Sequence, residues 1–564
     1  MPDEPHPFFL GDAKLVVLLL LLAAVTYGVA LGGTDLWAPD EPRCGEVARE
    51  MIQRGDYVLP HLNDEAYHHK PPLYYWLIVA AAKATGSGVD SFSARLPGAL
   101  MACVTILLTY LLGRHLWGRA EGFLGACAFG TCALAVYLSR RANFDTTLTA
   151  MTTLALYAFA RNAFSEKPRL GWDLLFFAAT GLAVLAKGPP GLGVPIGTAL
   201  CFWIVAGQKR IWNARRVALK LLGIGLMLGI FAAWAVPACL RGGPDFTRSL
   251  LLGQTIERLQ GHLGSHRRAF FYYFIQLPWC LFPWTIPFLF ACWHLVVDTK
   301  KEDRRPVVFL FIWFVWTFAM FTASASKRET YLLPLLPSAA LVVGKLIADR
   351  AFRPATEPVA KRLAIPFVLN ATVLVVVGAA AAYVGIAGRA LLERWAPAQD
   401  LSNIYAALRV PITWIGAALV AAGVATIIAV ANRRGGVAFT IQALAISGVA
   451  IAAAVFVLPE VNPYKSARQL CARLSERLRP GDEVVMFNLD EQGIPFYLGR
   501  TVETFDKNEI PSLVAWAHGK GMRYVVAEEA DYEAFLATRG DLRLESIDSQ
   551  GVGHRRVDVF QVAR

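Results

Sequence analysis

Long, uninterrupted runs of apolar residues constrain this chain more than any other feature of its sequence. The runs Leu15–Gly32, Leu363–Tyr383 and Val437–Leu458 are each long enough for a helix to cross a hydrocarbon core of roughly 30 Å. Because lipid offers the backbone no hydrogen-bond partners, such a run crosses only as a helix. Charged residues make up 17% of the chain, below the about one quarter that is usual for soluble domains. The sequence therefore predicts a polytopic α-helical membrane protein.

The first apolar run is interpreted as an uncleaved anchor rather than a secretory signal peptide. It is too long for the apolar region of a signal peptide, it lacks a clear small-x-small cleavage site, and many further runs follow it. The nine cysteines form no CxxC pattern, and most of them lie inside apolar runs. No disulfide framework and no cysteine metal site is therefore expected.

The apolar runs and the basic loops can be checked against each other. Thirteen spans are expected near residues 15–32, 95–113, 119–139, 145–163, 172–186, 188–206, 217–238, 271–297, 306–323, 330–349, 363–385, 410–431 and 437–458. If the N-terminus is cytoplasmic, every second loop should be rich in Lys and Arg, and all six such loops are. This placement also accounts for the net charge of +12 without nucleic acid as a partner.

The same alternation sets the domain organisation. Pro71–Thr85 would break it if this segment crossed the membrane, so an interfacial or re-entrant segment is expected. Residues 1–459 then form a membrane domain with long outer loops at 33–94 and 239–270, and residues 460–564 form a small outer α/β domain. The elements expected in that domain are strands at Glu483–Asn488 and Met522–Glu528 and helices at Pro463–Leu478 and Asp531–Thr538.

Two acidic positions on the outer side are candidates for chemistry. Asp40 and Glu41 follow the first span, and Asp145 stands at the outer start of the fourth. Ionisable residues near a membrane are costly unless they reach water or have a function. Each aspartate could equally be a helix cap. If they are functional, two acids at one membrane level could act as a base, as metal ligands or as anchors for an acceptor.

Basic residues gather on the same side, where the positive-inside pattern predicts few of them. They are Lys70 before two prolines, Lys187 at the end of a span, and Lys327 with Arg328 before the tenth span. Snorkelling to lipid headgroups is one explanation. The other is a bound phosphate, which cations in a partly dry site hold strongly.

Other residues in the outer loops are expected to have structural roles or to give only a weak metal signal. Trp37 is expected to anchor the interface, and Glu46, Arg49 and Glu50 are expected to lie on an amphipathic surface helix at the bilayer. His262 and His266 have the spacing of a metal pair on a helix, but Gly261 and Gly264 argue against a regular helix there.

In this order the blocks resemble the GT-C lipid-linked glycosyltransferases of the protein mannosyltransferase-like superfamily, and within it the lipid A 4-amino-4-deoxy-L-arabinose transferases. The matching blocks are W-x-P-D-E-x-R with its continuation at Trp37–Tyr57, V-L-P-H-L at Val58–Leu62, H-K-P-P-L-Y-Y-W at His69–Trp76, F-D at Asp145, A-K-G at Lys187, S-H-R-R-A-F-F-Y-Y at Ser265–Tyr273 and Y-L-L-P-L-L-P at Tyr331–Pro337.

The resemblance implies an inverting transfer of a sugar from undecaprenyl phosphate, with no nucleotide cofactor, to lipid A or another envelope glycan at the periplasmic face of a bacterial inner membrane. It implies that Asp40, Glu41 and Asp145 are catalytic. The implied donor-phosphate and substrate residues are Arg43, Lys70, Lys187, His266, Lys327, Arg328 and Tyr331.

The chain departs from the aminoarabinose pattern at two positions. His69 stands where the family commonly has a glutamate associated with a metal, and Cys44 stands in place of an aromatic residue. One divalent metal, with His69 and His266 as ligands, is therefore a hypothesis.

A transporter or flippase for a polyprenyl-linked sugar is the main alternative. It predicts ionisable residues near the bilayer midplane, often on broken helices. The sequence instead concentrates its unexplained ionisable residues at one interface.

Overall fold

The computed structural model describes residues 11–206, 214–250, 268–298, 303–351, 359–395, 402–528, 530–531, 544–553 and 555–563. The chain divides into two compact units. Unit 1 comprises Met1–Leu31, His68–Tyr74 and Arg95–Val457, and unit 2 comprises Gly32–Tyr67, Tyr75–Ala94 and Leu458–Arg564. The first outer loop, which was predicted to belong to the membrane domain, therefore falls mainly in the unit that contains the C-terminal sheet.

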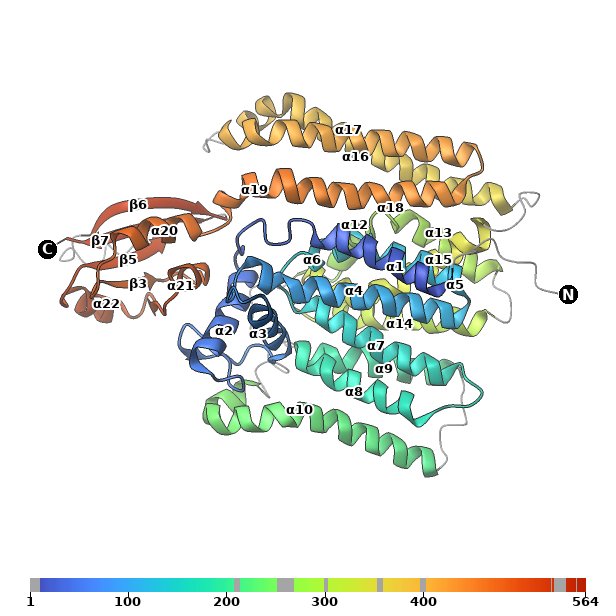
Figure 1. Ribbon diagram of the computed structural model, residues 1–564, viewed down its shortest axis with the longest axis horizontal. Coiled ribbons are helices and arrows are strands. Elements are labelled where there is room, and N and C mark those ends of the chain that lie inside the picture. The colour runs from blue at the N-terminus through green and yellow to red at the C-terminus, as the bar shows by residue number, and fades with distance from the viewer. Residues whose placement is uncertain are drawn as a thin grey trace. The chain divides into compact units, whose positions relative to one another are not determined.

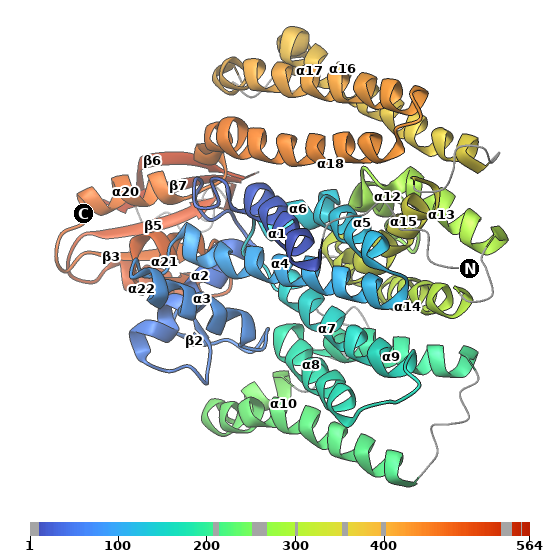
Figure 2. The same cartoon turned by 45° about the vertical axis from the view of Figure 1, so that its right-hand side comes forward.

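The regular elements of unit 1 among its described residues are helices. Its elements are α1 (Asp12–Ala23), η1 (Ala24–Gly28), α4 (Ser91–Leu116, except its first turn), α5 (Arg119–Gly130), α6 (Ala133–Ser139), α7 (Asp145–Ala163), α8 (Leu170–Lys187), α9 (Pro189–Ala206), α10 (Ala214–Arg248), α12 (Tyr272–Leu281), α13 (Thr285–Asp298), α14 (Arg304–Ala323), η4 (Glu329–Leu335), α15 (Leu336–Ala351), α16 (Val359–Trp395), α17 (Ser402–Ala431), α18 (Gly435–Ala452) and η5 (Ala453–Val457). Helices α7, α8 and α9 run side by side, and α14 packs against α9 (Figures 1 and 2).

The centre of unit 1 is the helical stretch Glu329–Asp349, which comprises η4 and most of α15. Its apolar window is 94% buried by protein, whereas the corresponding value is 28% for Ile404–Ala431. Helix α15 lies against α5 at backbone contact, because a Cβ on Gly344 would come within 2.4 Å of the Gly125 nitrogen. Close approach of this kind is how small residues let membrane helices pack without a hydrophobic driving force.

The membrane-spanning character is confirmed, but the count of thirteen spans is not. Among the described residues, nine helices are long and apolar enough to cross a membrane, and eleven cross if each bent pair forms one span. The bent pairs are α5 with α6, at 64°, and α12 with α13, at 102°. The segment predicted to be interfacial forms α3 (Leu73–Thr85), whose 13 residues cover roughly 20 Å and are too short to cross.

Two further predicted spans are helical but belong neither to those nine nor to a bent pair. The run near 15–32 forms only 12 α-helical residues before the wider turn η1. The run 145–163 forms α7, which carries Asp145, Arg161 and five threonines. All five threonines are buried, and two of them donate to the carbonyl one turn back, Thr149 to Asp145 at 2.7 Å and Thr152 to Leu148 at 2.9 Å. A helix surrounded by protein can carry threonines whose hydroxyls bond in this way to the helix itself.

Unit 2 contains a five-stranded sheet in the order β4-β3-β5-β7-β6. Its strands are β3 (Glu483–Phe487), β4 (Glu503–Phe505), β5 (Arg523–Glu528), β6 (Leu544–Val552) and β7 (Arg555–Val562). Strands β4, β3 and β5 are parallel, and β7 and β6 add to them antiparallel. Alternate residues of β3 face opposite sides of the sheet, with Met486 in one apolar cluster and Phe487 in the other.

The helices of unit 2 cover both faces of this sheet. Its other elements are α2 (Asp40–Arg54), β1 (His61–Leu62), β2 (Glu65–Ala66), most of α3, α19 (Leu458–Val461), η6 (Asn462–Tyr464), α20 (Arg468–Arg477), α21 (Gly493–Leu498) and α22 (Ile510–Ala517). The predicted α/β character and the two predicted strands are confirmed. The helix predicted at 463–478 begins later, at Arg468, and the helix predicted at 531–538 lies almost wholly outside the described residues.

Helix α2 packs against α21 inside unit 2. A Cβ on Gly45 would come within 2.9 Å of the Phe496 ring, and Arg49 donates to the Gly499 carbonyl at 2.8 Å. Before α2, the Asp35 carboxylate accepts from Asn462 at 2.8 Å and from Arg468 at 2.9 Å. The first outer loop is thus held by the C-terminal segment through polar contacts between residues that are distant in the sequence.

Candidate functional site

Asn143 fixes the start of α7 and thereby places Asp145. The Asn143 side-chain oxygen accepts from the backbone N–H groups of Asp145 at 3.0 Å and Thr146 at 3.1 Å. These are the unpaired donors that a cap normally satisfies at a helix N-terminus. The suggestion that Asp145 itself caps this helix is therefore wrong, and its carboxylate is available for another partner.

That partner is Lys187, the last residue of α8. Its ammonium donates to the Asp145 carboxylate, and the two side chains are only 8% and 7% exposed. The same ammonium lies 4.3 Å from the centre of the Tyr331 ring, in η4. Two buried opposite charges and an aromatic face therefore meet where three helical elements converge. The sequence analysis named all three residues as candidates for the site, but it did not predict that they are in contact.

The segment His68–Tyr74 is seated beside this ion pair within unit 1. Leu73 packs against Leu148 of α7 and against Ala183 and Ala186 of α8. The Tyr74 hydroxyl accepts from the Asn143 N–H at 3.0 Å, and this tyrosine is fully buried. Lys70 therefore belongs to a short stretch that is fastened next to both ends of the ion pair.

The predicted basic pair, Lys327 and Arg328, lies just before η4. Lys327 is 5% exposed, and its ammonium donates to the Ser324 carbonyl at 2.5 Å, while Arg328 is half-buried. Next to them, the Tyr272 hydroxyl donates to the Glu329 carboxylate at 3.0 Å. The Ser324 carbonyl therefore gives the Lys327 ammonium a hydrogen-bond acceptor, and among the described contacts this lysine does not meet an acid.

In unit 2, Asp40 and Glu41 have different surroundings. Asp40 is the first residue of α2, half-buried and preceded by Pro39 at the cap position, so the alternative in which Asp40 serves as the N-cap is excluded. Glu41 is 2% exposed, and its carboxylate accepts from the Trp37 N–H at 3.1 Å. The indole N–H of Trp37 donates to Asn462 at 2.8 Å. Glu41 thus holds the chain that leads into α2, and Asp40 presents its carboxylate in the first turn, where the helix dipole favours a negative charge.

Arg43 lies one turn along the same helix. Its guanidinium donates to the Asp490 carboxylate at 3.0 Å. Burial lowers the pKa of Arg43, but Tyr67, Asp490 and Asp40 nearby outweigh burial, so the net shift of this pKa is upward. The guanidinium therefore stays charged, as an anion-binding group must.

The next acids on α2 do not lie on an exposed surface, contrary to prediction. Glu46 is fully buried and pairs with Arg49 at 2.5 Å, and burial raises the pKa of Glu46. Glu50 is 2% exposed and accepts from the N–H groups of Asn63 at 2.5 Å and Asp64 at 3.2 Å. These two residues form the tight turn between β1 and β2 with positive φ, so Glu50 fixes a hairpin inside unit 2.

The sequence analysis missed several residues that shape the Asp145–Lys187 pair of unit 1 and the surroundings of Asp40 and Arg43 in unit 2. Asn143 had a usable signal, because an asparagine just before an apolar helix is a typical cap. Tyr74 lay within a recognised block, but without a stated role. Asp490 gave no signal, because it is 447 residues from Arg43 and lies in a polar loop.

The hypothesised metal pair of His69 and His266 falls partly outside the residues that the structure describes. Among the described residues, no three His, Cys, Asp or Glu side chains are grouped closely enough to hold a metal ion. His69 is exposed, with its ring centre 4.6 Å from that of His68, and His266 lies outside the described residues.

Known proteins resemble this chain in sequence over its N-terminal part and in fold over nearly its whole length. The family model described as dolichyl-phosphate-mannose-protein mannosyltransferase matches residues 69–236. An undecaprenyl phosphate-alpha-4-amino-4-deoxy-L-arabinose arabinosyl transferase of Pseudomonas aeruginosa is 32% identical over 347 residues, which are 59% of each chain. The corresponding protein of Pectobacterium atrosepticum is 29% identical over 338 residues, again 59% of each chain. The chain thus spans less than two thirds of the length of these relatives.

The fold likeness extends further than the sequence likeness. The crystal structure of ArnT from Cupriavidus metallidurans bound to undecaprenyl phosphate matches with a TM-score of 0.80 and 20% identity, covering 98% of both chains. Its apo structure matches with a TM-score of 0.79. The predicted resemblance is confirmed: this chain is a multi-pass membrane protein with the GT-C glycosyltransferase fold, similar in sequence to the undecaprenyl phosphate-aminoarabinose arabinosyl transferases.

Proposed function

We propose that this protein transfers 4-amino-4-deoxy-L-arabinose from undecaprenyl phosphate to lipid A at the periplasmic face of a bacterial inner membrane. The names of the relatives supply the donor and the sugar. The positive-inside pattern supports the outer position of the site. The acceptor follows from the resemblance of the ordered sequence blocks to the lipid A transferases.

One observation carries the proposal: a buried ammonium, Lys187, is held in place by a carboxylate and an aromatic face. A lipid phosphate that approaches this position would meet a cation that is already desolvated and oriented. Charge-assisted contacts to phosphate are strongest in such surroundings. In the proposed phosphate site of unit 1, Asp145 positions Lys187, and Lys70, Lys327 and Arg328 add positive charge.

The proposed reaction is a single displacement. An acceptor oxygen attacks the anomeric carbon opposite the lipid phosphate, the bond between that carbon and the phosphate oxygen breaks, and its electron pair leaves with the lipid phosphate. The configuration at the anomeric carbon is therefore inverted. Lys187 and its neighbours stabilise the charge that develops on the departing phosphate.

Asp40 is assigned to the acceptor side of this reaction. If the acceptor is a hydroxyl, the Asp40 carboxylate takes its proton as the bond forms. If the acceptor is an ionised phosphate, there is no proton to remove and Asp40 orients the attacking group. Glu41, whose carboxylate accepts from the Trp37 N–H, is assigned to holding α2 rather than to the chemistry.

A transporter would place its charged groups differently. In unit 1 the described buried ion pairs lie at helix ends: Asp145 begins α7, Lys187 ends α8, and Lys345 lies in the last turns of α15 with Asp349 at 3.0 Å. Transporter sites usually lie near the bilayer midplane at broken helices. The geometry therefore favours transfer at the membrane surface.

Mass spectrometry of envelope lipids tests the proposal directly. A strain that lacks the gene should lose the aminoarabinose adduct of lipid A, and the wild-type gene should restore it. The Asp145→Asn variant should not restore it, although the protein is present in membranes. If lipid A is unchanged in the deletion strain but another glycan is altered, that glycan is the acceptor instead of lipid A. If no glycan is altered, the proposed transfer is refuted.

A divalent metal stays a separate hypothesis that rests on the resemblance alone. If a metal is required, EDTA should abolish transfer in purified membranes and an added divalent ion should restore it. Transfer that is unchanged by EDTA would remove the metal from the proposal.

A further inference from the structure

Tyr273, in α12, carries a buried hydroxyl that the proposed transfer has not used. Its side chain is fully buried, and its O–H has no acceptor among the described residues. The adjacent Tyr272 differs, because its hydroxyl donates to the Glu329 carboxylate at 3.0 Å. A buried donor without an acceptor is destabilising, and native proteins keep few of them.

Tyr273 lies beside Tyr331 along one face of α14. The ring centre of Tyr273 is 6.3 Å from that of Phe318, and the ring centre of Tyr331 is 5.6 Å from that of Phe321. Phe318 and Phe321 are three residues apart, so they are neighbours on the surface of α14. The Tyr331 ring is also the aromatic face against which the Lys187 ammonium lies. Tyr273 therefore adjoins the buried ion pair of the proposed site.

The Asp145 carboxylate can accept the proton that Tyr273 has to offer. Asp145 is close enough to act electrostatically on the Tyr273 hydroxyl. The backbone N–H of Arg328 also approaches this hydroxyl, but an N–H is a donor and cannot accept. Lys187 donates to Oδ1 of Asp145, and among the described contacts Oδ2 has no donor. An unused donor and an unused acceptor are thus within electrostatic range of each other.

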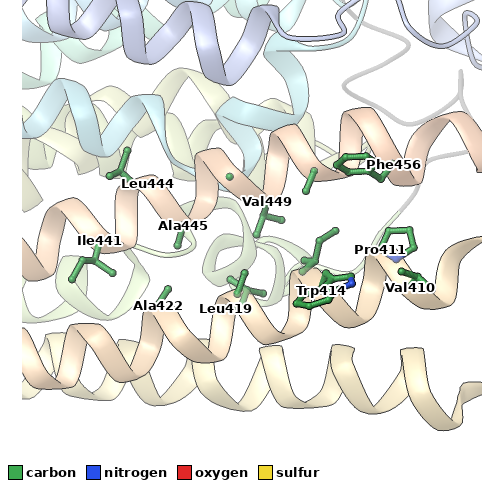
Figure 3. Close-up of a pocket in the computed structure, with 14 residues that line it drawn as sticks. Val410, Pro411, Trp414, Leu419, Ala422, Ile441, Leu444, Ala445, Val449 and Phe456 are labelled. Carbon is green, nitrogen blue, oxygen red and sulfur yellow. The ribbon is translucent and has the colours of Figure 1, made fainter.

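The surroundings of Tyr273 are closely packed. Open space in unit 1 lies elsewhere, in an apolar groove of about 700 Å³ between α17 and α18, lined by side chains such as Leu419 and Leu444 (Figure 3). The residues assigned to transfer do not line this groove. Because the Tyr273 hydroxyl is enclosed by protein, a partner for it comes from a small movement of a group that is already beside it.

Binding of a lipid phosphate changes what Asp145 requires. As Lys187 directs its charge towards the phosphate, the buried carboxylate of Asp145 loses part of its compensation. Leaving a buried charge without its partner costs more than one charge-assisted hydrogen bond returns. Lys187 therefore binds phosphate best where a second donor stabilises Asp145.

We propose that Tyr273 is a positioning residue, whose hydroxyl donates to the Asp145 carboxylate when Lys187 engages the phosphate of the polyprenyl donor. The inference rests on the proposed function, because the phosphate is that of the transferred sugar's carrier. The hydroxyl has no acceptor before the donor binds and gains one afterwards. The new hydrogen bond therefore contributes to the bound state alone and raises the affinity for the donor.

Binding of undecaprenyl phosphate to the full-length protein in nanodiscs tests this role. Tyr273→Phe should bind about tenfold more weakly, as expected for the loss of one hydrogen bond to a charged group. Its melting temperature without ligand should equal or exceed that of the wild type, because only an unbonded hydroxyl is removed. Undecaprenol, which has no phosphate, should bind equally to both proteins.

The neighbouring tyrosine provides a matched control. Tyr272→Phe loses the hydrogen bond to Glu329, so its melting temperature should fall. Its affinity for undecaprenyl phosphate should stay within about twofold of the wild type. The two tyrosines thus have opposite expected effects on stability and on binding.

A double variant tests the route through Asp145. The Asp145→Asn protein keeps Lys187 and lacks the negative charge that needs a second donor. Adding Tyr273→Phe to this protein should therefore change its affinity for undecaprenyl phosphate less than about twofold. A tenfold loss that persists in the double variant would overturn the proposal, because Tyr273 would then act without Asp145.

The remaining outcomes separate this inference from the proposed function. If wild type and Tyr273→Phe bind undecaprenyl phosphate equally, the role of Tyr273 is refuted and the proposed transfer stands. If Tyr273→Phe also binds undecaprenol more weakly, the effect is one of packing and the role is again refuted. If the wild type itself does not bind undecaprenyl phosphate, the proposed function fails.

Discussion

Lys187 carries a positive charge that the fold has largely removed from water. Its side chain is 8% exposed and that of its partner Asp145 is 7% exposed. In such a pair, removal of one charge leaves the other buried without compensation. The stability effect and the binding effect of Lys187 must therefore be separated by experiment.

A double variant separates these effects. Lys187→Met alone should lower the free energy of unfolding by about 3–5 kcal/mol, because Asp145 stays charged and buried. Lys187→Met with Asp145→Asn should recover most of this loss in thermal unfolding. It should still bind undecaprenyl phosphate roughly 10–100 times more weakly, as expected for one charge-assisted bond. Binding by the double variant that equals the wild type would exclude Lys187 from the phosphate site.

The neighbours Asp40 and Glu41 should also behave differently. Asp40→Asn should reduce the transfer rate by roughly 100-fold or more if Asp40 is the base, with an unchanged unfolding temperature. Glu41→Gln should retain transfer, because its amide oxygen still accepts from Trp37, whereas Glu41→Ala should lose about 1–3 kcal/mol of stability. Transfer rates and melting curves of the three variants distinguish a catalytic role from a structural role for each residue. A rate for Glu41→Gln as low as that for Asp40→Asn would make Glu41 catalytic.

At the scale of the element, the start of α7 organises the site in unit 1. Asn143 caps the helix, Tyr74 bonds to Asn143, and Leu73 packs against α7 and α8. The regular geometry of the helix backbone then fixes where the carboxylate of Asp145 points. A local cap thus controls a long-range ion pair.

Removing the cap should show this control. Asn143→Ala should cost about 1 kcal/mol of stability and lower the transfer rate, since the first turn of α7 loses its side-chain acceptor. Asn143→Ser, which can still cap, should restore both values towards the wild type. Melting temperature and transfer rate are measured for each. A normal rate in Asn143→Ala would show that Asp145 is placed without the cap.

At the scale of the whole molecule, unit 2 is assembled from segments that lie at opposite ends of the sequence. Asn462 accepts from the backbone of Asp35 and from the Trp37 indole, at 2.9 and 2.8 Å, and donates to the Asp35 carboxylate. The residues that lead into α2 are therefore held by the segment that follows the last span. The C-terminal region is expected to maintain the position of Asp40 as well as to form its own domain.

This coupling predicts an effect at a distance. Asn462→Ala should increase hydrogen exchange in residues 33–43 and lower the transfer rate, while exchange in the sheet of unit 2 stays the same. Asn432→Ala is the matched control, because Asn432 is exposed and bonds only to the Ile428 carbonyl among the described contacts. Unchanged exchange at 33–43 in Asn462→Ala would show that other contacts hold the loop.

Hydropathy and the alternation of basic loops are local properties, so they can be read along the chain. They were enough to predict which segments enter the membrane and to single out Asp40, Asp145, Lys70 and Lys187 as candidate site residues. The order of the surrounding blocks indicated the fold.

Which of these groups become partners depends on the three-dimensional packing of the chain. The Asp145–Lys187 pair is separated by 42 residues and the Arg43–Asp490 pair by 447. Such contacts depend on how helices pack, and packing depends on the combined shape of many side chains. For the same reason Glu46 and Glu50, whose spacing suggested an exposed helix face, are buried against their own partners. Charge pattern predicts that a residue lies near the membrane surface, but packing decides whether it faces water, lipid or another charge.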